Sequence, residues 1–512
     1  MAEQKEKPYA IECRGITKVF GTVVANDKID LSVKYGEILA LLGENGSGKT
    51  TLMNMLSGIY HPDEGSISIS GQRVAINSPH DAIDLGIGMI HQHFKLVEVF
   101  SAMDNIIAGT PGKLKKRSVM RNDISEISQK LGLDVDPDKK IYDMSVSEKQ
   151  TVEILKVLYR GAKILILDEP TAVLTPQETE KLFDMLRRMR NDGCAIIIIT
   201  HKLNEVLSIS DRVTVLRKGQ SVATVNTAET DDKKLTELMV GKPVSLSISR
   251  PEPVDPEPLI NVYHLSVDKP DGTVGLDDVT FDICKGEILG VAGVAGSGQK
   301  ELCETIAGLI DIKAGAVLYN KENIIGKSTK EIIDLGISMS FVPEDRLGMG
   351  LVAGMSITNN VILKSYNHNP GPFIDSKFAK KLAEQIVHDF DIYTPSVNYT
   401  VKKLSGGNIQ KVLLGREIWL SPKVLITAYP VRGLDIGASY NIYHMLNEQK
   451  KKGVAVLFIG EDLDVLKSIS DRLMVIHDGE IIDIVDPTTV TKEDIGLMMV
   501  GDHINKGEEK AV

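Results

Sequence analysis

Short apolar runs with few polar interruptions recur along the chain. They cover residues 38–43, 163–168, 195–200 and 213–216 in the first half, and 288–293, 424–427, 455–460 and 473–476 in the second. Strands buried on both faces of a parallel sheet have this pattern. Stretches with a helical period lie between them, such as residues 51–59, where Leu52, Met55 and Leu56 share one face. The alternation predicts a doubly wound α/β core in each half, with residues 95–160 and 350–420 forming mostly helical insertions.

The two halves repeat one another. The segment ITHKLNEVLSISDRVTVLRKG, from Ile199, matches IGEDLDVLKSISDRLMVIHDG, from Ile459. Near the start of each half, YGEILALLGENGSGKTTL matches KGEILGVAGVAGSGQKEL. A repeat of this length is a duplication of a whole domain and not a solenoid of small units. The sequence therefore predicts one domain at residues 1–243 and a second at 259–505.

The segment between the halves, residues 244–258, is rich in proline, and we expect an extended, semi-rigid linker there. Residues 506–512 form a polar tail. The first ten residues contain no apolar segment typical of a secretory signal, and no apolar run approaches the roughly 20 residues that span a bilayer. If the protein serves transport, other chains must provide the pore.

Composition narrows the choice of partners. The formal net charge of the 512 residues is -11, which argues against a mainly phosphate-driven grip on nucleic acid, because that requires a basic face. The four cysteines form no C-x-x-C pair, so the sequence indicates no zinc site.

A phosphate-binding loop opens the first half. Residues 43–50 fit the pattern G-x-x-x-x-G-K-[ST], after an apolar strand and before a predicted helix, which is the context the motif requires. The glycines let backbone N–H groups point at phosphate oxygens, and the helix N-terminus adds partial positive charge. We expect Lys49 to bind the β- and γ-phosphates and Thr50 to ligate Mg²⁺.

Two carboxylates and a histidine follow neighbouring strands. Asp168 and Glu169 end an apolar run, and a strand beside the phosphate loop would place Asp168 near the metal and leave Glu169 to polarise water. His201 ends the next apolar run, at the strand edge where open α/β sheets bind ligands. A lone histidine is more often structural, but this placement favours a contact with the γ-phosphate.

Together these residues resemble those of the ATP-binding-cassette (ABC) ATPases. The resemblance covers essentially the whole chain, since each half resembles one ABC domain. The resemblance implies the fold class: α/β, with two tandem ABC ATPase domains, each a parallel-sheet core with a phosphate loop and an inserted helical subdomain. It implies ATP and Mg²⁺ as cofactors, Glu169 and His201 as catalytic residues, and metal contacts from Thr50, Gln92 and Asp168. It places these nucleotide contacts in the first half: Phe20 (stacked on adenine, although a core Phe is the alternative), Gly43, Glu44, Asn45, Gly46, Ser47, Gly48, Lys49, Thr50, Thr51 and Gln92.

The second half contributes the remaining contacts. Leu404 to Asn408 read LSGGN and resemble the family's LSGGQ signature, so the resemblance implies that Ser405, Gly406, Gly407 and Asn408 contact the γ-phosphate from a helix N-terminus. Asp435 would be the aspartate of the loop named after it in the family. ABC domains pair head to tail, so each ATP would lie between the phosphate loop of one half and the signature of the other.

The residues that depart from the family pattern all fall in one of the two expected ATP sites. At matching positions the second half carries Gln299 for Lys49, Lys300 for Thr50, Ala428 and Tyr429 for the two carboxylates, Glu461 for His201 and Glu344 for Gln92. The first half has lost both signature glycines in residues 144–148, and residues 172–175 lack the aspartate. In a head-to-tail pair, every intact part falls in one site and every altered part in the other. We therefore expect one hydrolysing site and one structural or regulatory site.

The motifs also indicate a class of machine. The Gln-Lys phosphate loop, residues 342–346 (VPEDR) and LSGGN resemble the ATPases of monosaccharide importers, whereas residues 90–97 and the carboxylate-free residues 427–430 look more like the purine-nucleoside branch of that group. This implies two membrane permease subunits, an extracytoplasmic substrate-binding lipoprotein, and a peripheral position on the cytoplasmic face of the membrane, with nucleoside cargo favoured over a simple sugar.

Soluble tandem ABC proteins that act on ribosomes or in DNA repair are the alternative class. The ribosomal kind has a long charged linker and the repair kind has zinc-binding cysteine clusters, and this sequence has neither. A non-hydrolysing regulator conflicts with the intact Asp168–Glu169 pair.

Overall fold

The computed structural model describes residues 9–91, 94–110, 116–133, 135–172, 174–241, 248–253, 256–341, 350–366, 374–432, 434 and 436–502. The chain divides into two compact units, residues 1–245 and 246–512, and each is described by itself. Two positions named above, Gln92 and Asp435, lie outside the described residues, as does the segment 342–349 with Glu344.

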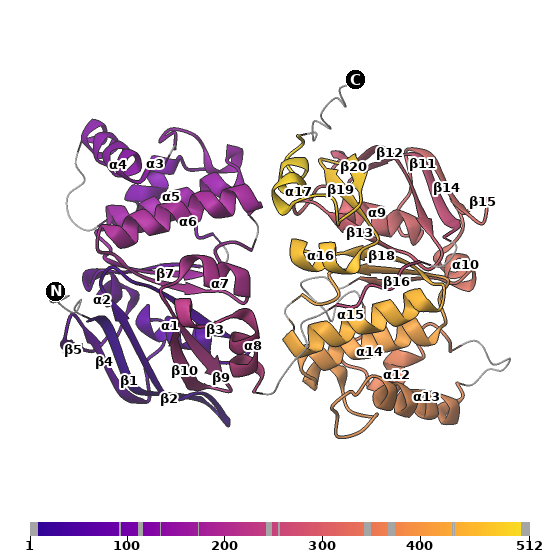
Figure 1. Cartoon of the computed structure of the whole chain (residues 1–512), viewed down its shortest axis with the longest axis horizontal. Helices are drawn as coiled ribbons and strands as arrows, with labels where there is room; N and C mark the ends of the chain where they lie inside the picture. The colour runs from indigo at the N-terminus through magenta and orange to yellow at the C-terminus, as the bar shows by residue number, and fades with distance from the viewer. Residues whose placement is uncertain are drawn as a thin grey trace. The chain divides into compact units, whose positions relative to one another are not determined.

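The first unit contains two sheets (Figure 1). An antiparallel sheet has the order β2-β1-β4-β5 and is formed by β1 (Tyr9–Phe20), β2 (Val23–Lys34), β4 (Glu64–Ile69) and β5 (Gln72–Val74). The second sheet has the order β10-β9-β3-β8-β7-β6, parallel except for β10, and is formed by β3 (Ile38–Gly43), β6 (Ile87–Ile90), β7 (Ile164–Asp168), β8 (Ala195–Ile199), β9 (Arg212–Arg217) and β10 (Gln220–Asn226). Its central strands are buried on both faces, as their unbroken apolar sequences predict.

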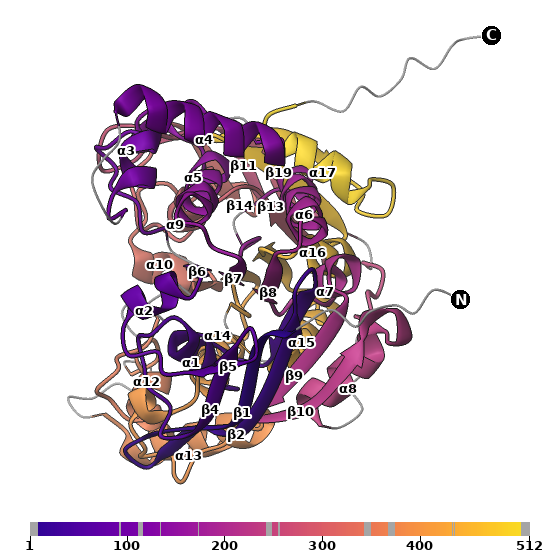
Figure 2. The same ribbon diagram turned by 90° about the vertical axis from the view of Figure 1, so that its left-hand side faces the viewer.

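Helices of the first unit fall into two groups. Those near the sheets are α1 (Lys49–Leu56), α2 (Pro79–Asp84), α6 (Pro176–Asn191), α7 (Leu203–Ile209) and α8 (Asp232–Val240), and those of the helical subdomain are α3 (Ala102–Ile107), α4 (Arg117–Leu131) and α5 (Val146–Tyr159). Figure 2 shows α3, α4 and α5 lying together. The subdomain has its own apolar cluster, which includes Met103, Ile124 and Leu155. Helix α1 ends at Leu56, earlier than the predicted stretch 51–59, because Gly58 takes a left-handed conformation (φ 75°) that turns the chain away.

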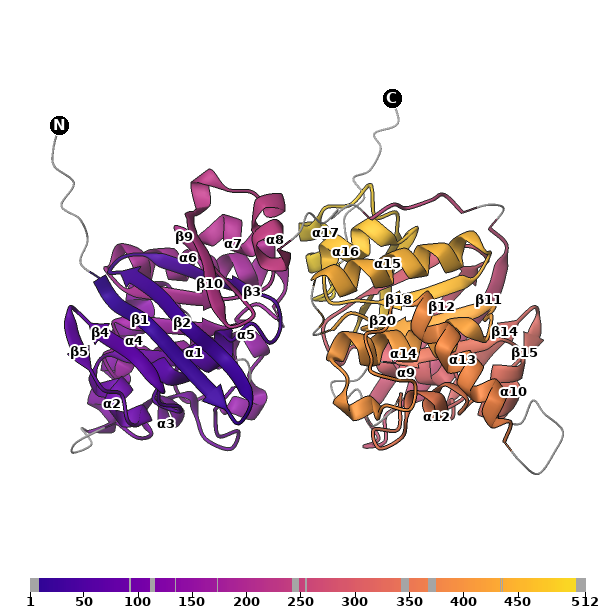
Figure 3. The ribbon, with the colours of Figure 1, turned by 90° about the horizontal axis from the view of Figure 1, so that it is seen from below.

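The second unit repeats the topology (Figure 3). Its antiparallel sheet, β12-β11-β14-β15, contains β11 (Pro258–Asp268), β12 (Val274–Cys284), β14 (Ala314–Tyr319) and β15 (Glu322–Asn323). Its six-stranded sheet, β16-β17-β18-β13-β19-β20, contains β13 (Ile288–Ala292), β16 (Ile337–Phe341), β17 (Val424–Ala428), β18 (Ala455–Ile459), β19 (Arg472–His477) and β20 (Glu480–Val485). Its helices are α9 (Gln299–Ile306), α10 (Thr329–Asp334), α12 (Ile357–Val361), α13 (Ser376–Asp389), α14 (Gly406–Trp419), α15 (Ile436–Lys451), α16 (Leu463–Ile469) and α17 (Lys492–Met498).

Part of the proline-rich segment is attached to the second unit. Ile248 packs against an apolar cluster of that unit. The backbone oxygen of Ser249 accepts a hydrogen bond from Asn447 Nδ2 (2.6 Å), and Arg250 Nη1 donates to the backbone oxygen of Ser470 (2.8 Å). These bonds fix residues 248–250 before β11 begins.

Among the described residues, every helix is too short or too polar to cross a bilayer.

Candidate active site

The phosphate loop of the first unit runs from the end of β3 to the start of α1, as predicted. Gly46 and Gly48 have φ of 81° and 98°, a left-handed conformation that favours glycine. A Cβ on Gly48 would lie 2.5 Å from the backbone oxygen of Ala25, and a Cβ on Gly43 would lie 2.4 Å from that of Leu216. Residues with side chains cannot replace these glycines without moving the backbone of neighbouring strands.

Lys49 is buried at the first turn of α1 and closes the loop. Its Nζ donates to the backbone oxygens of Gly43 (2.6 Å) and Glu44 (3.0 Å). Burial lowers the pKa of Lys49, and the nearby Glu169 and Asp168 oppose that shift. The ammonium group is therefore poorly solvated, which favours binding of an anion.

Three hydroxyl groups accompany the lysine. Ser47 is 4 % exposed, and its Oγ has no hydrogen-bond partner in the described part of the chain. Buried polar atoms are rarely left without a partner, so this hydroxyl is available to a bound molecule. Thr50 is exposed and Thr51 is half-buried at the start of α1, while Asn45 is exposed on the loop. Phosphate oxygens would satisfy these groups together with the helix N-terminus.

Asp168 and Glu169 leave the end of β7 in different environments. Burial, together with the charge of Glu169, raises the pKa of Asp168 to about 6, and Lys49 opposes this. The carboxylate of Asp168 and the hydroxyl of Thr50 are hard oxygen donors, and this chemistry fits a Mg²⁺ ion bound beside phosphate.

Glu169 is held by His201, which follows β8. Nδ1 of His201 lies 3.0 Å from Oε1 of Glu169. This hydrogen bond is the main cause that lowers the pKa of Glu169, and it outweighs burial, which raises the pKa. The backbone of Glu169 is left-handed (φ 47°), and its N–H donates to the backbone oxygen of Ile199 (2.8 Å). The structure thus brings together Lys49, Asp168, Glu169 and His201, as their order along the sequence predicted.

Phe20 lies at the end of β1 and is 41 % exposed. Tyr60, which the sequence did not single out because it belongs to no motif, packs edge-on against it with ring centroids 5.2 Å apart. Lys18 Nζ lies 5.5 Å from the centroid of the Phe20 ring and pairs with Asp63 at 2.9 Å. An exposed, held aromatic ring of this kind can stack on a base.

The glycine turn Ser405–Asn408 belongs to the second unit, at the N-terminus of α14. Ser405 caps the helix: its Oγ accepts from Asn408 N (3.4 Å) and from Asn408 Nδ2 (2.8 Å). Oδ1 of Asn408 in turn accepts from the backbone N–H of Tyr393 (2.9 Å). The half-buried Gly406 and Gly407 follow the cap as the first residues of the helix, where backbone N–H groups have no intrahelical acceptor.

The matching turn of the first unit is chemically different. Glu148 forms a capping box with Ser145 at the start of α5: its Oε2 accepts from the Ser145 backbone N–H (2.7 Å), and its own N–H donates to Ser145 Oγ (3.2 Å). Lys139 pairs with the same carboxylate at 2.7 Å. A negative charge of the protein already occupies this helix N-terminus, which disfavours a phosphate there.

The matching phosphate loop of the second unit keeps the left-handed glycines of the first but has no lysine at the position of Lys49. Gly296 and Gly298 have φ of 93° and 108°. Gln299 occupies the lysine position, and its Nε2 donates to the backbone oxygen of Val294 (3.0 Å). Lys300 turns toward Glu304 (3.8 Å). The ammonium group that bonds to this loop comes from another segment, since Lys269 Nζ donates to the backbone oxygen of Gly296 (3.2 Å).

The carboxylate position of the second unit is also altered. Tyr429 has the left-handed backbone of Glu169 (φ 52°), and burial raises the pKa of its hydroxyl to about 12. Arg432 lies 5.8 Å from the centroid of that ring and pairs with Glu461 (3.1 Å). A neutral phenol stands here in place of a general base.

Comparison with known proteins shows which family has this arrangement of residues. The family model described as ABC transporter matches residues 26–172 and 276–430. The chain belongs to the ABC transporter family. It is 42 % identical to a nucleoside import ATP-binding protein of Lactococcus lactis over 97 % of this chain and 99 % of the relative. It is 42 % identical to a guanosine import ATP-binding protein of Bacillus subtilis over 96 % of this chain and 98 % of that one. It is 39 % identical to a glucose import ATP-binding protein of Haloferax volcanii over 96 % of each chain.

The predicted fold class and the resemblance to the ATPases of nucleoside and monosaccharide importers are therefore confirmed. The protein is an ABC ATPase, an enzyme that binds and hydrolyses ATP.

Proposed function

We propose that this ABC ATPase drives import of a nucleoside by hydrolysing ATP at one composite site. That site takes its phosphate loop, Asp168, Glu169 and His201 from the first unit and its signature turn from the second. The observation that carries the proposal is the contrast between the Glu169–His201 pair, 3.0 Å apart, and the Tyr429–Arg432–Glu461 cluster at the matching place. The sorting of altered residues between the two sites supports the head-to-tail pairing.

In this site Lys49 and the loop N–H groups hold the phosphates, and Phe20 stacks on the base. Asp168, Thr50 and Gln92 would hold Mg²⁺, which when bound neutralises charge on the β- and γ-phosphates. Glu169 accepts a proton from the attacking water, and His201 orients the carboxylate. A base so placed contributes about 10²–10⁴ in rate. Ser405 to Asn408 and Asp435 close the site over the γ-phosphate.

Substitution of the two cap serines tests the pairing. We expect Ser405→Arg to abolish ATPase activity, because a long side chain at the α14 N-terminus blocks the γ-phosphate. We expect Ser145→Arg to leave most of it, because Glu148 already fills the α5 N-terminus. The measurement is steady-state phosphate release by the purified full chain. If Ser145→Arg lost its ATPase activity and Ser405→Arg kept it, the result would contradict the pairing.

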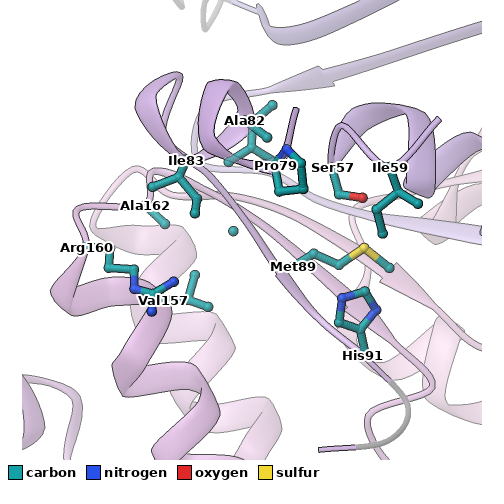
Figure 4. A pocket seen from close by; sticks show the side chains of 12 residues that line it. Ser57, Ile59, Pro79, Ala82, Ile83, Met89, His91, Val157, Arg160 and Ala162 are labelled. Carbon is teal, nitrogen blue, oxygen red and sulfur yellow. The ribbon is translucent and has the colours of Figure 1, made fainter. Parts of the chain in front are cut away.

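We propose that two permease subunits dock on the helical subdomains, with the chain peripheral on the cytoplasmic face of the membrane and a lipoprotein delivering the substrate from outside. A cavity of about 220 Å³ in the first unit supports a docking site (Figure 4). It lies between α2, β6 and the end of α5, and His91, the residue before Gln92, lines it. A few residues after His91, the segment 97–100 pairs with the segment 140–142 through backbone hydrogen bonds. Tyr142 N donates to the backbone oxygen of Glu98 (3.2 Å), and Ile141 N donates to that of Phe100 (3.1 Å).

Nucleoside cargo is supported by the nucleoside and guanosine importers among the relatives, both 42 % identical. The glucose importer at 39 % identity keeps a simple sugar as the second candidate. This chain does not contact the substrate in either case, so cargo follows from its partners.

A further inference from the structure

A buried cluster of charges joins α14 to the sheet of the second unit. Glu417 in α14 is 0 % exposed, and its carboxylate accepts from Lys364 Nζ (2.7 Å) and from Arg416 Nε (2.9 Å) and Nη2 (2.8 Å). The hydroxyl of Ser338, in β16, donates to the same carboxylate.

The cluster ties several segments to one helix. Ser338 belongs to the sheet and Lys364 follows α12, while Arg416 also donates to the backbone oxygens of Gly350 (2.9 Å) and Asn360 (3.4 Å). Three separate stretches of the second unit, at residues 338, 350 and 360–364, are therefore connected to the C-terminal part of α14.

The carboxylate stays ionised inside the protein. Burial by itself raises the pKa of Glu417, but Lys364, Arg416 and Ser338 together outweigh it, and the pKa lies below its ordinary value. A buried charge with this many partners tolerates little movement, because leaving any of them exposes an unpaired charge to an apolar interior.

The first unit provides an internal comparison. Asn105 and Asn360 mark equivalent places, since each accepts from the N–H of the residue eight positions earlier through Oδ1 (2.8 and 2.7 Å). Four residues further, Lys364 is matched by Gly109. Ser338 is matched by Gly88, each the second residue of its strand, and Glu417 by Val157, each the twelfth residue of its helix.

The matched joint of the first unit is apolar. A Cβ on Gly88 would lie 1.8 Å from Val157 Cγ1, so that strand and helix touch without room for a polar side chain. The cavity described above opens beside the contact, and Arg160, next to Val157 at the end of α5, also lines it (Figure 4). Apolar contacts beside a cavity can shift at smaller cost than a buried ion cluster.

We propose that Glu417 is a positioning residue for ATP hydrolysis: with Ser338 and Lys364 it fixes the angle of α14 to its sheet, and so the place of the signature turn. The proposal rests on the proposed function, in which that turn contacts ATP. At 1.5 Å per residue, Gly406 lies roughly 16 Å along the helix from Glu417, so a tilt of about 4° moves it by about 1 Å. A displacement of that size at a reacting centre can cost about 10² in rate.

Glu417→Gln tests the proposal in the full chain, since it keeps the shape of the side chain and removes its charge. We expect kcat for ATP to fall by about tenfold or more while KM stays within about twofold, because Lys49 and Phe20 are untouched. Hydrogen exchange of backbone amides 410–416 in α14 should speed up, whereas exchange of the matched amides 150–156 in α5 should not change.

A matched control separates positioning from general loss of stability. Lys450, buried in α15, pairs at 2.6 Å with the half-buried Asp471, the residue before β19, and so joins α15 to the start of β19 instead of α14 to β16. Lys450→Met should lower the melting temperature as Glu417→Gln does, yet keep kcat within about twofold. An equal loss of kcat in both variants would overturn the positioning role.

Two further variants complete the design. If Glu417→Gln does not fold, Ser338→Ala removes one bond of the cluster and should lower kcat by about threefold. Ser405→Arg, measured in parallel, tests the proposed function itself, and full activity in that variant would overturn it. If Ser405→Arg is inactive while Glu417→Gln keeps wild-type kcat and exchange, the positioning role alone fails.

Discussion

At the scale of single residues, the two units use one backbone for two chemistries. Glu169 and Tyr429 share a left-handed conformation, and each donates its N–H to the last residue of the neighbouring strand, Ile199 O at 2.8 Å and Ile459 O at 2.9 Å. A backbone conformation that is uncommon for residues other than glycine persists where the carboxylate does not. The second unit therefore preserves the backbone geometry of Glu169, our proposed general base, while the neutral phenol of Tyr429 stands in place of the carboxylate.

This contrast gives a prediction. We expect Glu169→Gln to lower kcat by about 10²–10⁴ with a small change in KM, since the amide cannot accept the proton of the attacking water. Tyr429→Phe removes the matching hydroxyl and should leave kcat within about twofold. Single-turnover and steady-state ATP hydrolysis by the purified chain measure both. Full activity in Glu169→Gln would end the assignment of this residue as the base.

Residues in motifs were predictable, and residues that act through packing were not. Lys49, Asp168 and Glu169 could be placed because each follows a recognisable strand at a fixed spacing. Tyr60 and Glu417 belong to no motif, and their roles depend on which elements meet in space. Roles for Gln92 and Asp435 stay predictions, because these residues lie outside the described part of the chain.

At the scale of elements, the N-termini of helices α5 and α14 differ in how their first N–H groups are satisfied. Both begin with a serine cap, but α14 continues with two glycines, whereas α5 carries Glu148 three residues after its cap. The capping box stabilises α5 by satisfying its first N–H groups internally. In the proposed site assignment, the glutamate that stabilises α5 also disfavours a phosphate at its N-terminus.

Element boundaries were harder to predict than element types. The strands appear where the apolar runs predicted them, because an unbroken apolar run suits burial on both faces. In the proline-rich segment, composition indicated an extended chain, but bonds to Asn447 and from Arg250 fix residues 248–250 on the second unit. Such long-range bonds leave no local signal in the sequence.

The strip formed by residues 97–100 and 140–142 yields a prediction about docking. Four apolar side chains on it are exposed: Val97 (47 %), Val99 (65 %), Phe100 (44 %) and Tyr142 (59 %). Contiguous exposed apolar surface of this kind marks interaction sites. We expect Phe100→Asp to abolish co-purification with the permeases from detergent extract, because burying an unpaired charge in an apolar interface is costly.

The same variant should keep the basal ATPase rate of the isolated chain. Val274→Asp, on the antiparallel sheet of the second unit where the side chain is 52 % exposed, is the matched control and should still co-purify. Retention of the permeases by Phe100→Asp, or their loss in both variants, would refute docking at this strip.

At the scale of the whole molecule, duplication followed by divergence accounts for the division of labour that we propose between the two units. Each unit keeps the full strand order and its own apolar core, so each folds around the same scaffold. Within that scaffold the first unit retains Lys49, Asp168, Glu169 and His201, and the second retains the glycine turn and has a buried ion cluster near the other end of the same helix. If the two ABC domains of one chain share a single hydrolytic site, the chain needs only one intact copy of each motif that forms that site.

The cargo can be decided only with the complete transporter, because in the function we propose this chain supplies energy and a binding lipoprotein supplies selectivity. We expect the permeases and lipoprotein that co-purify with the chain to take up labelled guanosine in vesicles loaded with ATP, and Glu169→Gln to reduce uptake as strongly as it reduces hydrolysis. Labelled glucose and ribose serve as matched substrates, since a sugar importer would prefer them. A nucleoside differs from a sugar by a base, and a pocket built for that base rejects ligands lacking it, since its polar groups would be left unpaired. Uptake of glucose or ribose without guanosine would therefore replace the nucleoside assignment with a sugar importer, and the role of Glu169 would stand unaltered.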